Sequence, residues 1–298
     1  MVGSPPTRTQ AWILAARPKT LSAAAAPVVV GIGLAAFHGV ASALPAAGAL
    51  VGALLIQIAT NLANDYYDFI RGGDTHERVG PVRVTQAGLL APEDVRRGML
   101  VVLGAALLVG VYMVWVGGLP MLVLGLASLA CAVLYTGGPW PLAYHGLGDL
   151  FVFVFFGLVS VSGTVYVQGL IWPGDAFLAG AAMGAVTTAI LVVNNLRDIP
   201  TDAKAGKRTL AVRLGPAATK AEYVLLLLTT LVIPVVGVVG WGWPRASLAA
   251  LLAAPLCVAP LRRVLSFKEP LELLPALGET SRVVALYGAL LGLGLALG

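Results

Sequence analysis

The sequence predicts an all-α membrane protein, a polytopic bundle of nine transmembrane helices around a central cavity that opens at the cytoplasmic face. Hydrophobic residues make up 58% of the chain and charged residues only 11%, and the mean hydropathy is +0.90. Soluble domains are ordinarily about one quarter charged, so this composition indicates a chain surrounded by lipid. Apolar runs of the roughly 20 residues that cross a bilayer recur throughout. We therefore expect one transmembrane domain over residues 1–298 and no soluble domain.

Nine apolar runs qualify as candidate spans. The first, rich in alanine, and the eighth, which contains Pro255 and Pro260, fit the pattern least well. No convincing cleavage site follows the first run, so we expect it to remain in the mature protein. In chain order, the spans are centred near Val29, Leu54, Leu107, Ala127, Leu158, Ala185, Leu228, Leu252 and Leu290.

The basic residues fall on one side of this map. The polar segments before the first span and after the second, sixth and eighth hold 18 of the 19 Lys and Arg residues, leaving only Arg245 on the other side. Because cytoplasmic loops carry the excess of Lys and Arg, we expect a protein of the cell membrane with its N-terminus and its basic loops inside and its C-terminus outside. Bases placed between membrane spans argue against a nucleic-acid partner. Nothing in the sequence indicates an obligate protein partner.

Cysteine and histidine residues give no sign of a disulfide framework or a zinc site. Cys131 and Cys257 lie in apolar runs without a CxxC spacing or a histidine partner, so we interpret them as small core residues. His38, His76 and His145 share no ligand spacing, and we interpret them as loop residues.

A polar helix face marks the end of the second span. Asn61, Asn64, Asp65 and Asp68 are three and four residues apart, so they share one face of an α-helix. Residues 44–63, which lead up to this face, include no charged residue. Carboxylates at the end of a membrane span are costly and usually functional.

A second polar face follows the sixth span. Asn194, Asp198 and Asp202 are spaced i, i+4 and i+8, and they lie in a row if the helix continues past Pro200, where proline usually kinks or ends a helix. Both faces run into Arg and Lys residues on the predicted cytoplasmic side. Carboxylate and amide oxygens bind Mg²⁺, which is usually shared with substrate phosphates, and the bases take the remaining phosphate charge. The two faces therefore predict a site for a Mg²⁺-bound diphosphate.

The two motifs NDYYD (residues 64–68) and DIPTD (residues 198–202) resemble those of the UbiA superfamily of intramembrane aromatic prenyltransferases. Four stretches, one of which contains NDYYD, resemble the branch that prenylates 1,4-dihydroxy-2-naphthoate in menaquinone synthesis: ARPKTLSAAAAPVVVG (16–31), NLANDYYDFIRGGD with RVGPVRVTQAG (61–74 and 78–88), YTGGPWPLAYHGLGDL (135–150) and GKRTLAVRLG (206–215). One departure concerns the wider pattern NDxxDxxxD, whose last carboxylate falls at Gly72. The next carboxylate is Asp74, in a GGD segment that resembles the naphthoate branch.

The resemblance implies a polyprenyl diphosphate that ionises at its allylic C–O bond and an electron-rich ring that attacks the resulting cation. In the naphthoate branch, loss of the ring carboxylate accompanies the alkylation and gives demethylmenaquinone in its reduced, quinol form. Mg²⁺ would neutralise charge on the departing diphosphate, with Asp68 and Asp198 expected to be essential. The implied metal ligands are Asn64, Asp68, Asn194, Asp198, Asp202 and Asp74, with Asn61 and Asp65 supporting them from behind.

The other expected roles concern the diphosphate, the cation and the acceptor. Tyr135 matches the superfamily's tyrosine near the reacting carbon, and Tyr66, Tyr67 and Trp140 are further aromatic candidates for a dry pocket around the cation. The prenyl tail would lie among apolar helices and membrane lipid. The candidate diphosphate-binding bases are Arg71, Arg83, Lys207 and Arg208, and Arg17 and Lys19 are candidates for the acceptor's carboxylate.

Other functions stay open at this point. A different acceptor, such as 4-hydroxybenzoate, homogentisate, a chlorin or haem, would use the same metal site. An ion-coupled transporter also carries paired intramembrane carboxylates, but transporters usually place them near the bilayer midplane. A non-catalytic scaffold would give no reason for two matched Asn and Asp rows.

Overall fold

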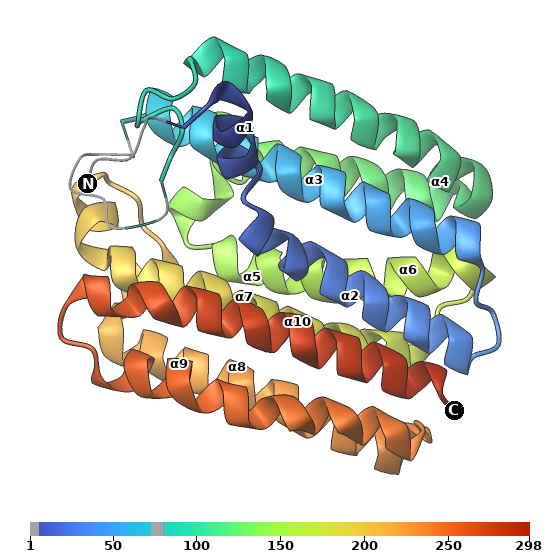
Figure 1. Ribbon diagram of the computed structural model, residues 1–298. Helices are drawn as coiled ribbons and strands as arrows, with labels where there is room; N and C mark the ends of the chain where they lie inside the picture. The colour runs from blue at the N-terminus through green and yellow to red at the C-terminus, as the bar shows by residue number, and fades with distance from the viewer. Residues whose placement is uncertain (1–5, 73–79, 81) are drawn as a thin grey trace.

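The computed structural model describes residues 6–72, 80 and 82–298, and these form helices and connecting segments without a strand (Figure 1). The helices lie side by side in one bundle, with α1 at one end and the C-terminus at the other (Figure 1). The described α-helices are α1 (Arg8–Ala16), α2 (Pro18–Phe37), α3 (Ala43–Ile70), α4 (Pro92–Leu134), α5 (Gly148–Val152), α6 (Ser160–Gly169), α7 (Gly174–Lys204), α8 (Leu210–Trp241), α9 (Ala254–Ser266) and α10 (Leu274–Ala296). Short 3₁₀ helices cover Leu142–His145, Arg245–Ala253 and Pro270–Leu273, and a π-helix, η2, covers Phe153–Val159.

The all-α membrane bundle predicted from composition is confirmed. Within the described residues, seven helical segments are long and apolar enough to cross a membrane. The predicted third and fourth spans are the two arms of α4, which bends at Gly118, where φ is 64° and ψ is −149° (Figure 1). This left-handed conformation suits glycine because it has no Cβ. The number nine stays a prediction, since it requires each arm of α4 and also α10 to cross.

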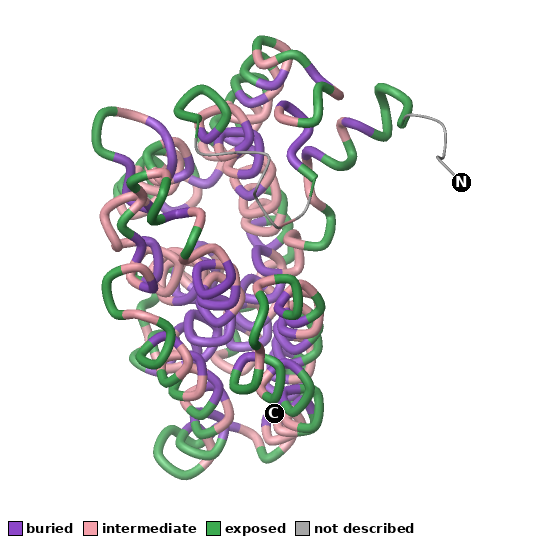
Figure 2. The backbone as a smooth tube through the Cα atoms, turned by 90° about the vertical axis from the view of Figure 1, so that its left-hand side faces the viewer, coloured by how far each residue is buried: buried purple, intermediate pink, exposed green. Residues whose placement is uncertain are grey.

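Helix α7 is the central helix of the bundle. In its most apolar window 72% of the residues are buried, against 17% in α4. Close approach to η2 explains part of this burial, because a Cβ at Gly184 would lie only 2.6 Å from the backbone oxygen of Phe153. Figure 2, seen from the end that carries α1, shows buried residues concentrated in the interior of the bundle and exposed residues along its rim. The residues of α7 are thus held more firmly than those of the peripheral helices.

Two features at the ends of α2 were not predicted from the sequence. Helix α1 forms before the first span, capped by Thr7 and Gln10, and ends at Arg17 in a left-handed conformation with φ of 51°. At the opposite end of α2, His38 does follow the helix, but its Nε2 lies 3.0 Å from Asp175 Oδ1 at the start of α7. Trp243 Nε1 donates to the same carboxylate at 2.9 Å, so Asp175 ties three separate segments together.

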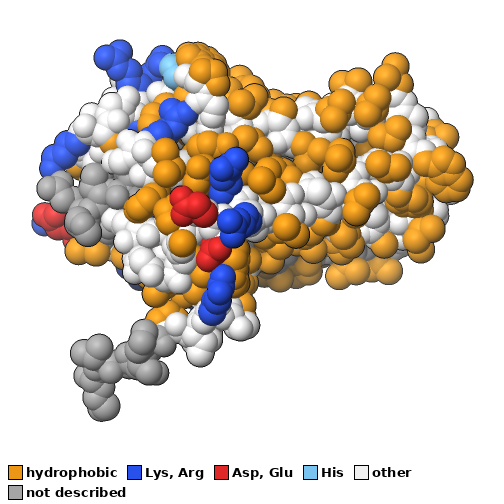
Figure 3. Space-filling model, turned by 90° about the horizontal axis from the view of Figure 1, so that it is seen from above, with side chains coloured by type: hydrophobic (Ala, Val, Ile, Leu, Met, Phe, Trp, Pro, Cys, Tyr) orange, Lys and Arg blue, Asp and Glu red, His pale blue; other side chains and the backbone are white. Residues whose placement is uncertain are grey.

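The distribution of charge on the surface agrees with a membrane setting. Figure 3 shows Lys and Arg side chains gathered towards one end of the bundle, while the rest of that face is mostly hydrophobic. Large exposed apolar side chains include Trp115 (82%), Val239 (83%) and Leu108 (74%). Exposed apolar area on this scale is typical of lipid-facing helices.

Candidate active site

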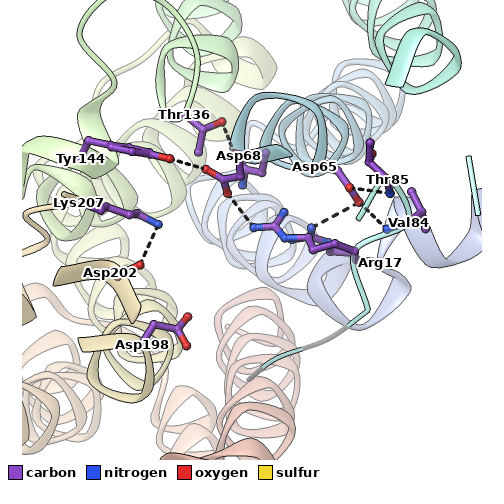
Figure 4. Close-up of polar contacts among 12 residues, drawn as sticks. Arg17, Asp65, Asp68, Val84, Thr85, Thr136, Tyr144, Asp198, Asp202 and Lys207 are labelled. Carbon is purple, nitrogen blue, oxygen red and sulfur yellow. Dashed lines mark hydrogen bonds and ion pairs between the residues drawn. The ribbon is translucent and has the colours of Figure 1, made fainter. Parts of the chain in front are cut away.

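The structure brings the two predicted polar faces together at one end of the bundle (Figure 4). Asn61 to Asp68 occupy the last turns of α3. Helix α7 continues through Pro200 to Lys204, so Asn194, Asp198 and Asp202 lie in a row on one helix. The helix therefore does continue past Pro200, which was the condition for these three side chains to lie in a row.

Asp65 and Asn61 fix the segments that surround the α3 face. Asp65 is fully buried and accepts hydrogen bonds from the backbone N–H groups of Val84 and Thr85, both at 3.2 Å. Asn61 donates to the backbone oxygen of Ala16 at 2.9 Å and to the Thr20 hydroxyl at 3.0 Å. Both residues hold chain segments against α3, an arrangement that fits the supporting role expected for them.

Asp68 carries a basic and a phenolic partner. Arg83 Nη2 donates to its Oδ2 at 2.9 Å and the Tyr144 hydroxyl donates to its Oδ1 at 3.2 Å. Two of the predicted diphosphate-binding bases flank the ring of Tyr144, with Arg71 5.6 Å and Lys207 5.5 Å from the ring centroid. Arg71 also donates to the backbone oxygen of Gly138. Tyr144 thus joins the α3 carboxylate to bases from both polar loops.

The carboxylates of α7 are also held by bases. Arg197 makes a bidentate pair with Asp198, with Nε–Oδ1 and Nη2–Oδ2 distances of 2.7 Å. Arg197, one of the bases counted after the sixth span, lies within α7, and its side chain is fully buried. Lys207 Nζ lies 3.7 Å from Asp202 Oδ1 (Figure 4).

The remaining predicted bases differ in position. Arg17 lines the cavity described below, and its Nη2 lies 3.9 Å from Asp65 Oδ2. Lys19 and Arg208 are exposed, and the backbone N–H of Arg208 donates to the backbone oxygen of Tyr144 at 3.0 Å. Asp74, the remaining predicted metal ligand, lies outside the described residues.

The donors fit Mg²⁺ shared with a diphosphate better than a metal cage built by protein alone. Within the described ranges, no three His, Cys, Asp or Glu side chains gather as a metal-binding group. Mg²⁺ commonly takes only one or two protein carboxylates and completes its shell with waters and substrate phosphates. Carboxylates and amides on two facing helices meet that requirement. In the structure, Arg and Lys side chains neutralise the same carboxylates.

An apolar cavity of about 360 Å³ starts at this polar end. It reaches Asn64 on α3 and Asn194 on α7, each one turn before a carboxylate on the same helix face. Its far end is lined by Met113 and Met121, on the two arms of α4. Thr136 donates to Asn64 Oδ1 at 2.9 Å and so fixes one amide at the mouth.

Tyr135 lines the cavity next to the polar end. Its hydroxyl lies 2.9 Å from where a Cβ of Gly148 would be. Burial in the cavity wall raises the pKa of the Tyr135 phenol, and the carboxylates of Asp149, Asp68 and Asp202 raise it further. The phenol therefore remains protonated at neutral pH.

The other aromatic candidates lie elsewhere, so that expectation was wrong. Tyr66 and Tyr67 pack edge to face against each other, and Trp140 is 53% exposed and stacks on His145. None of these three belongs to the cavity lining. Its aromatic wall consists of Tyr135 together with Phe151, Phe155 and Phe156.

A sequence model of the UbiA prenyltransferase family matches residues 24–273. The chain belongs to the UbiA prenyltransferase family. Two relatives carry the name 1,4-dihydroxy-2-naphthoate octaprenyltransferase. The one from Escherichia coli (strain K12) is 38% identical over 300 residues, covering 97% of this chain and 96% of that protein. The one from Mycobacterium tuberculosis (strain ATCC 25618 / H37Rv) is 40% identical over 287 residues, covering 96% and 97%.

The fold likewise resembles that of solved UbiA structures. A UbiA homolog from Archaeoglobus fulgidus, solved bound to GPP and Mg²⁺, superposes with a TM-score of 0.62 at 16% identity, covering 94% of this chain and 99% of that one. At an identity this low, the superposition shows a shared fold and nothing more. The match extends from the first apolar helices to the last, so the multi-pass membrane architecture of the family is present here.

Several contacts in this UbiA-family site were missed from the sequence. Tyr144 and Thr136 lie 76 and 72 residues from the side chains they bind. Asp149 is buried within α5 and accepts a hydrogen bond from Asn195 Nδ2 at 3.4 Å. Two signals could have drawn attention to Asp149: it lies directly before the apolar run LFVFVFFGLV, and it belongs to the stretch YTGGPWPLAYHGLGDL (135–150).

Proposed function

We propose that this protein transfers a polyprenyl group from a polyprenyl diphosphate to 1,4-dihydroxy-2-naphthoate, with Mg²⁺, in menaquinone biosynthesis. The observation that carries the proposal is the meeting of two Asn and Asp faces at the mouth of an apolar cavity. A diphosphate needs the polar end, and a polyprenyl tail needs the apolar cavity. The names of the relatives support naphthoate as the acceptor.

We assign the metal to the facing helices. Asn64 and Asp68 on α3 and Asn194, Asp198 and Asp202 on α7 would hold Mg²⁺, and Asp74 remains a further candidate outside the described residues. Bound Mg²⁺ would neutralise charge as it develops on the departing diphosphate. Arg71, Arg83, Lys207 and Arg208 would bind the diphosphate oxygens, because Arg and Lys side chains near Tyr144 and Asp68 surround the same space.

The acceptor would bind between Arg17 and Tyr135. Arg17 lines the cavity, so its guanidinium can bind the acceptor's carboxylate, whereas the exposed Lys19 can contribute only through longer-range attraction. The protonated Tyr135 phenol would lie beside the reacting carbon, where its ring face can help to stabilise the cation. Apolar side chains around it exclude water, which would otherwise capture the cation.

The site would face the cytoplasm in the plasma membrane, with residues 1–298 acting as one domain. Its position at one end of the bundle, among the basic residues, supports this placement. The same position disfavours an ion-coupled transporter, whose sites lie near the midplane.

A transfer assay tests the proposal. The purified protein is incubated with a labelled polyprenyl diphosphate and 1,4-dihydroxy-2-naphthoate, with and without Mg²⁺, beside Asp68→Ala and Asp198→Ala. We expect Mg²⁺-dependent prenylated product that is lost in both variants. Prenylation of 4-hydroxybenzoate or homogentisate instead of 1,4-dihydroxy-2-naphthoate would show that the acceptor is a different aromatic compound. Absence of product from every acceptor, with folded protein, would refute the enzyme assignment.

A further inference from the structure

The cavity wall next to Tyr135 is formed by an unusual helix. Helix α5 begins at Gly148, on which the Tyr135 hydroxyl packs, and it continues directly into the π-helix η2 (Phe153–Val159). Short π-helical segments within α-helices are rare and frequently lie at functional sites. From this segment three phenylalanine side chains line the cavity, namely Phe151, Phe155 and Phe156.

Phe151 and Phe155 form an ordered pair within that wall. Their ring centroids are 5.9 Å apart and their planes differ by 8°. Helical side chains lean towards the N-terminus of their own helix. Both rings therefore lean back towards Gly148, which is the side of Tyr135 and the polar mouth.

The depth of the pair matches the expected position of the allylic carbon. Leu191 packs against the same glycine, with its Cδ2 3.5 Å from where a Gly148 Cβ would be, and it precedes Asn194 by one turn of α7. Phe151 follows Gly148 by one turn of α5. Since one turn is about 5.4 Å long, Phe151 lies within about two turns of Asn194. Because the allylic carbon is bonded to the diphosphate, we expect it between that mouth and the two rings.

We propose that Phe151 and Phe155 are catalytic residues that stabilise the allylic cation, with Phe151 at the reacting carbon and Phe155 behind it. This inference rests on the proposed function. In the step concerned, the allylic C–O bond breaks and its electron pair leaves with the diphosphate. An electron pair of the acceptor ring then forms the new C–C bond, and the carboxylate departs as CO₂ while its bonding pair stays in the ring. Until that bond forms, the electron-rich ring faces stabilise the positive charge.

The test distinguishes the effect of the electron density of the Phe151 ring from the effect of its shape. Phe151 is replaced, by codon suppression, with phenylalanines carrying one, two and three fluorine atoms, which withdraw electron density and nearly preserve size. The single-turnover rate of prenyl transfer is measured, because product release cannot mask it. We expect a stepwise fall on the order of tenfold across the series, an unchanged KM for the polyprenyl diphosphate, and a smaller fall for the same series at Phe155. Phe177, which is exposed on α7, provides the matched control and should show no trend.

A second readout follows the fate of the cation. Phe151→Leu should raise the fraction of labelled donor that ends as prenyl alcohol, since water captures a less protected cation. A rate independent of fluorination at Phe151 would overturn the inference and leave the rings as cavity packing. Failure of the proposed function is a different result, in which the protein with its natural Phe151 prenylates no acceptor. Should Phe151→Leu not fold, the fluorinated series still decides the question.

Discussion

At the scale of single residues, Asp198 combines a packing role with its proposed chemistry. Its carboxylate is the partner of the buried Arg197 guanidinium, whose Nη1 has no hydrogen-bond partner in the structure. Removing one partner of a buried ion pair costs about 3–5 kcal/mol, because a charge is left unpaired. An inactive Asp198 variant could therefore be inactive because it is unstable.

A double substitution separates the two effects. Asp198→Asn should lower both Tm and kcat. Combining it with Arg197→Met removes the unpaired charge, so Tm should return towards that of the unmodified protein. The rate should stay down by roughly 100-fold or more, the usual effect of losing one preorganised electrostatic group. Thermal unfolding in detergent and initial rates measure the two quantities, and recovered activity in the double variant would contradict a role for Asp198 in the chemistry.

Arg17 offers a second residue-scale prediction. Asn tolerates the left-handed backbone conformation found at this position, so Arg17→Asn removes the charge with little change in the chain path. We expect the KM for 1,4-dihydroxy-2-naphthoate to rise about tenfold or more, since hydrogen bonds to charged groups contribute about 1.5–3 kcal/mol. The KM for the polyprenyl diphosphate should not change. Lys19→Asn is the matched control, because Lys19 is exposed, and an equal effect there would argue against a specific contact.

Residue-level prediction succeeded where helix geometry alone decides the outcome. Asn64 and Asp68 share a face because they are four residues apart, and the sequence contains that information. Tyr144 could not be found in this way, because its contact with Asp68 depends on how α3 packs beside the segment after α4. The burial of Arg197 could not be predicted for a related reason: its bidentate pairing with Asp198, which the sequence does not reveal, allows a base to be buried within α7.

At the scale of elements, periodicity located the long helices but not their interruptions. The composition of residues 148–169 predicts one apolar span, and nothing in it distinguishes the π-helix from a regular α-helix. The bend at Gly118 was anticipated only as a boundary between two spans. The π-helix depends on packing against neighbouring helices, which overrides local preference, whereas the bend uses the positive φ that glycine accommodates at Gly118.

The contact between α7 and η2 leads to an element-scale prediction. A Cβ at Gly184 would lie 2.6 Å from the Phe153 backbone oxygen, so Gly184→Ala must separate the two helices. Overpacking of this kind typically costs about 1–3 kcal/mol, and we expect a lower Tm together with slower prenyl transfer. Gly104→Ala on α4 is the matched control, since a Cβ there meets nothing within 4 Å. Similar Tm values for the two variants would show that α7 and η2 can part without cost.

At the scale of the whole molecule, composition was sufficient to predict that the protein lies in a lipid bilayer. Lipid around the bundle explains why Trp115 and Val239 are almost fully exposed on its surface. The number of crossings was harder to predict, because hydropathy cannot decide whether a long apolar helix such as α4 crosses once or, after a bend, twice. The predicted pairing of two polar faces required only that both helices end on the same side.

Membrane orientation is the remaining whole-molecule prediction. In a background carrying Cys131→Ala and Cys257→Ala, which removes both native thiols, Arg208→Cys and Arg245→Cys place one thiol at each end of the bundle. If basic loops face the cytoplasm, a membrane-impermeant maleimide should label Arg245→Cys in intact cells and Arg208→Cys only after permeabilisation. The reverse pattern would place the diphosphate site outside the cell. Labelling of both positions in intact cells would mean that the chain adopts two orientations, since Arg208 precedes α8 and Arg245 follows it, so the two residues lie at opposite ends of a helix that crosses the membrane.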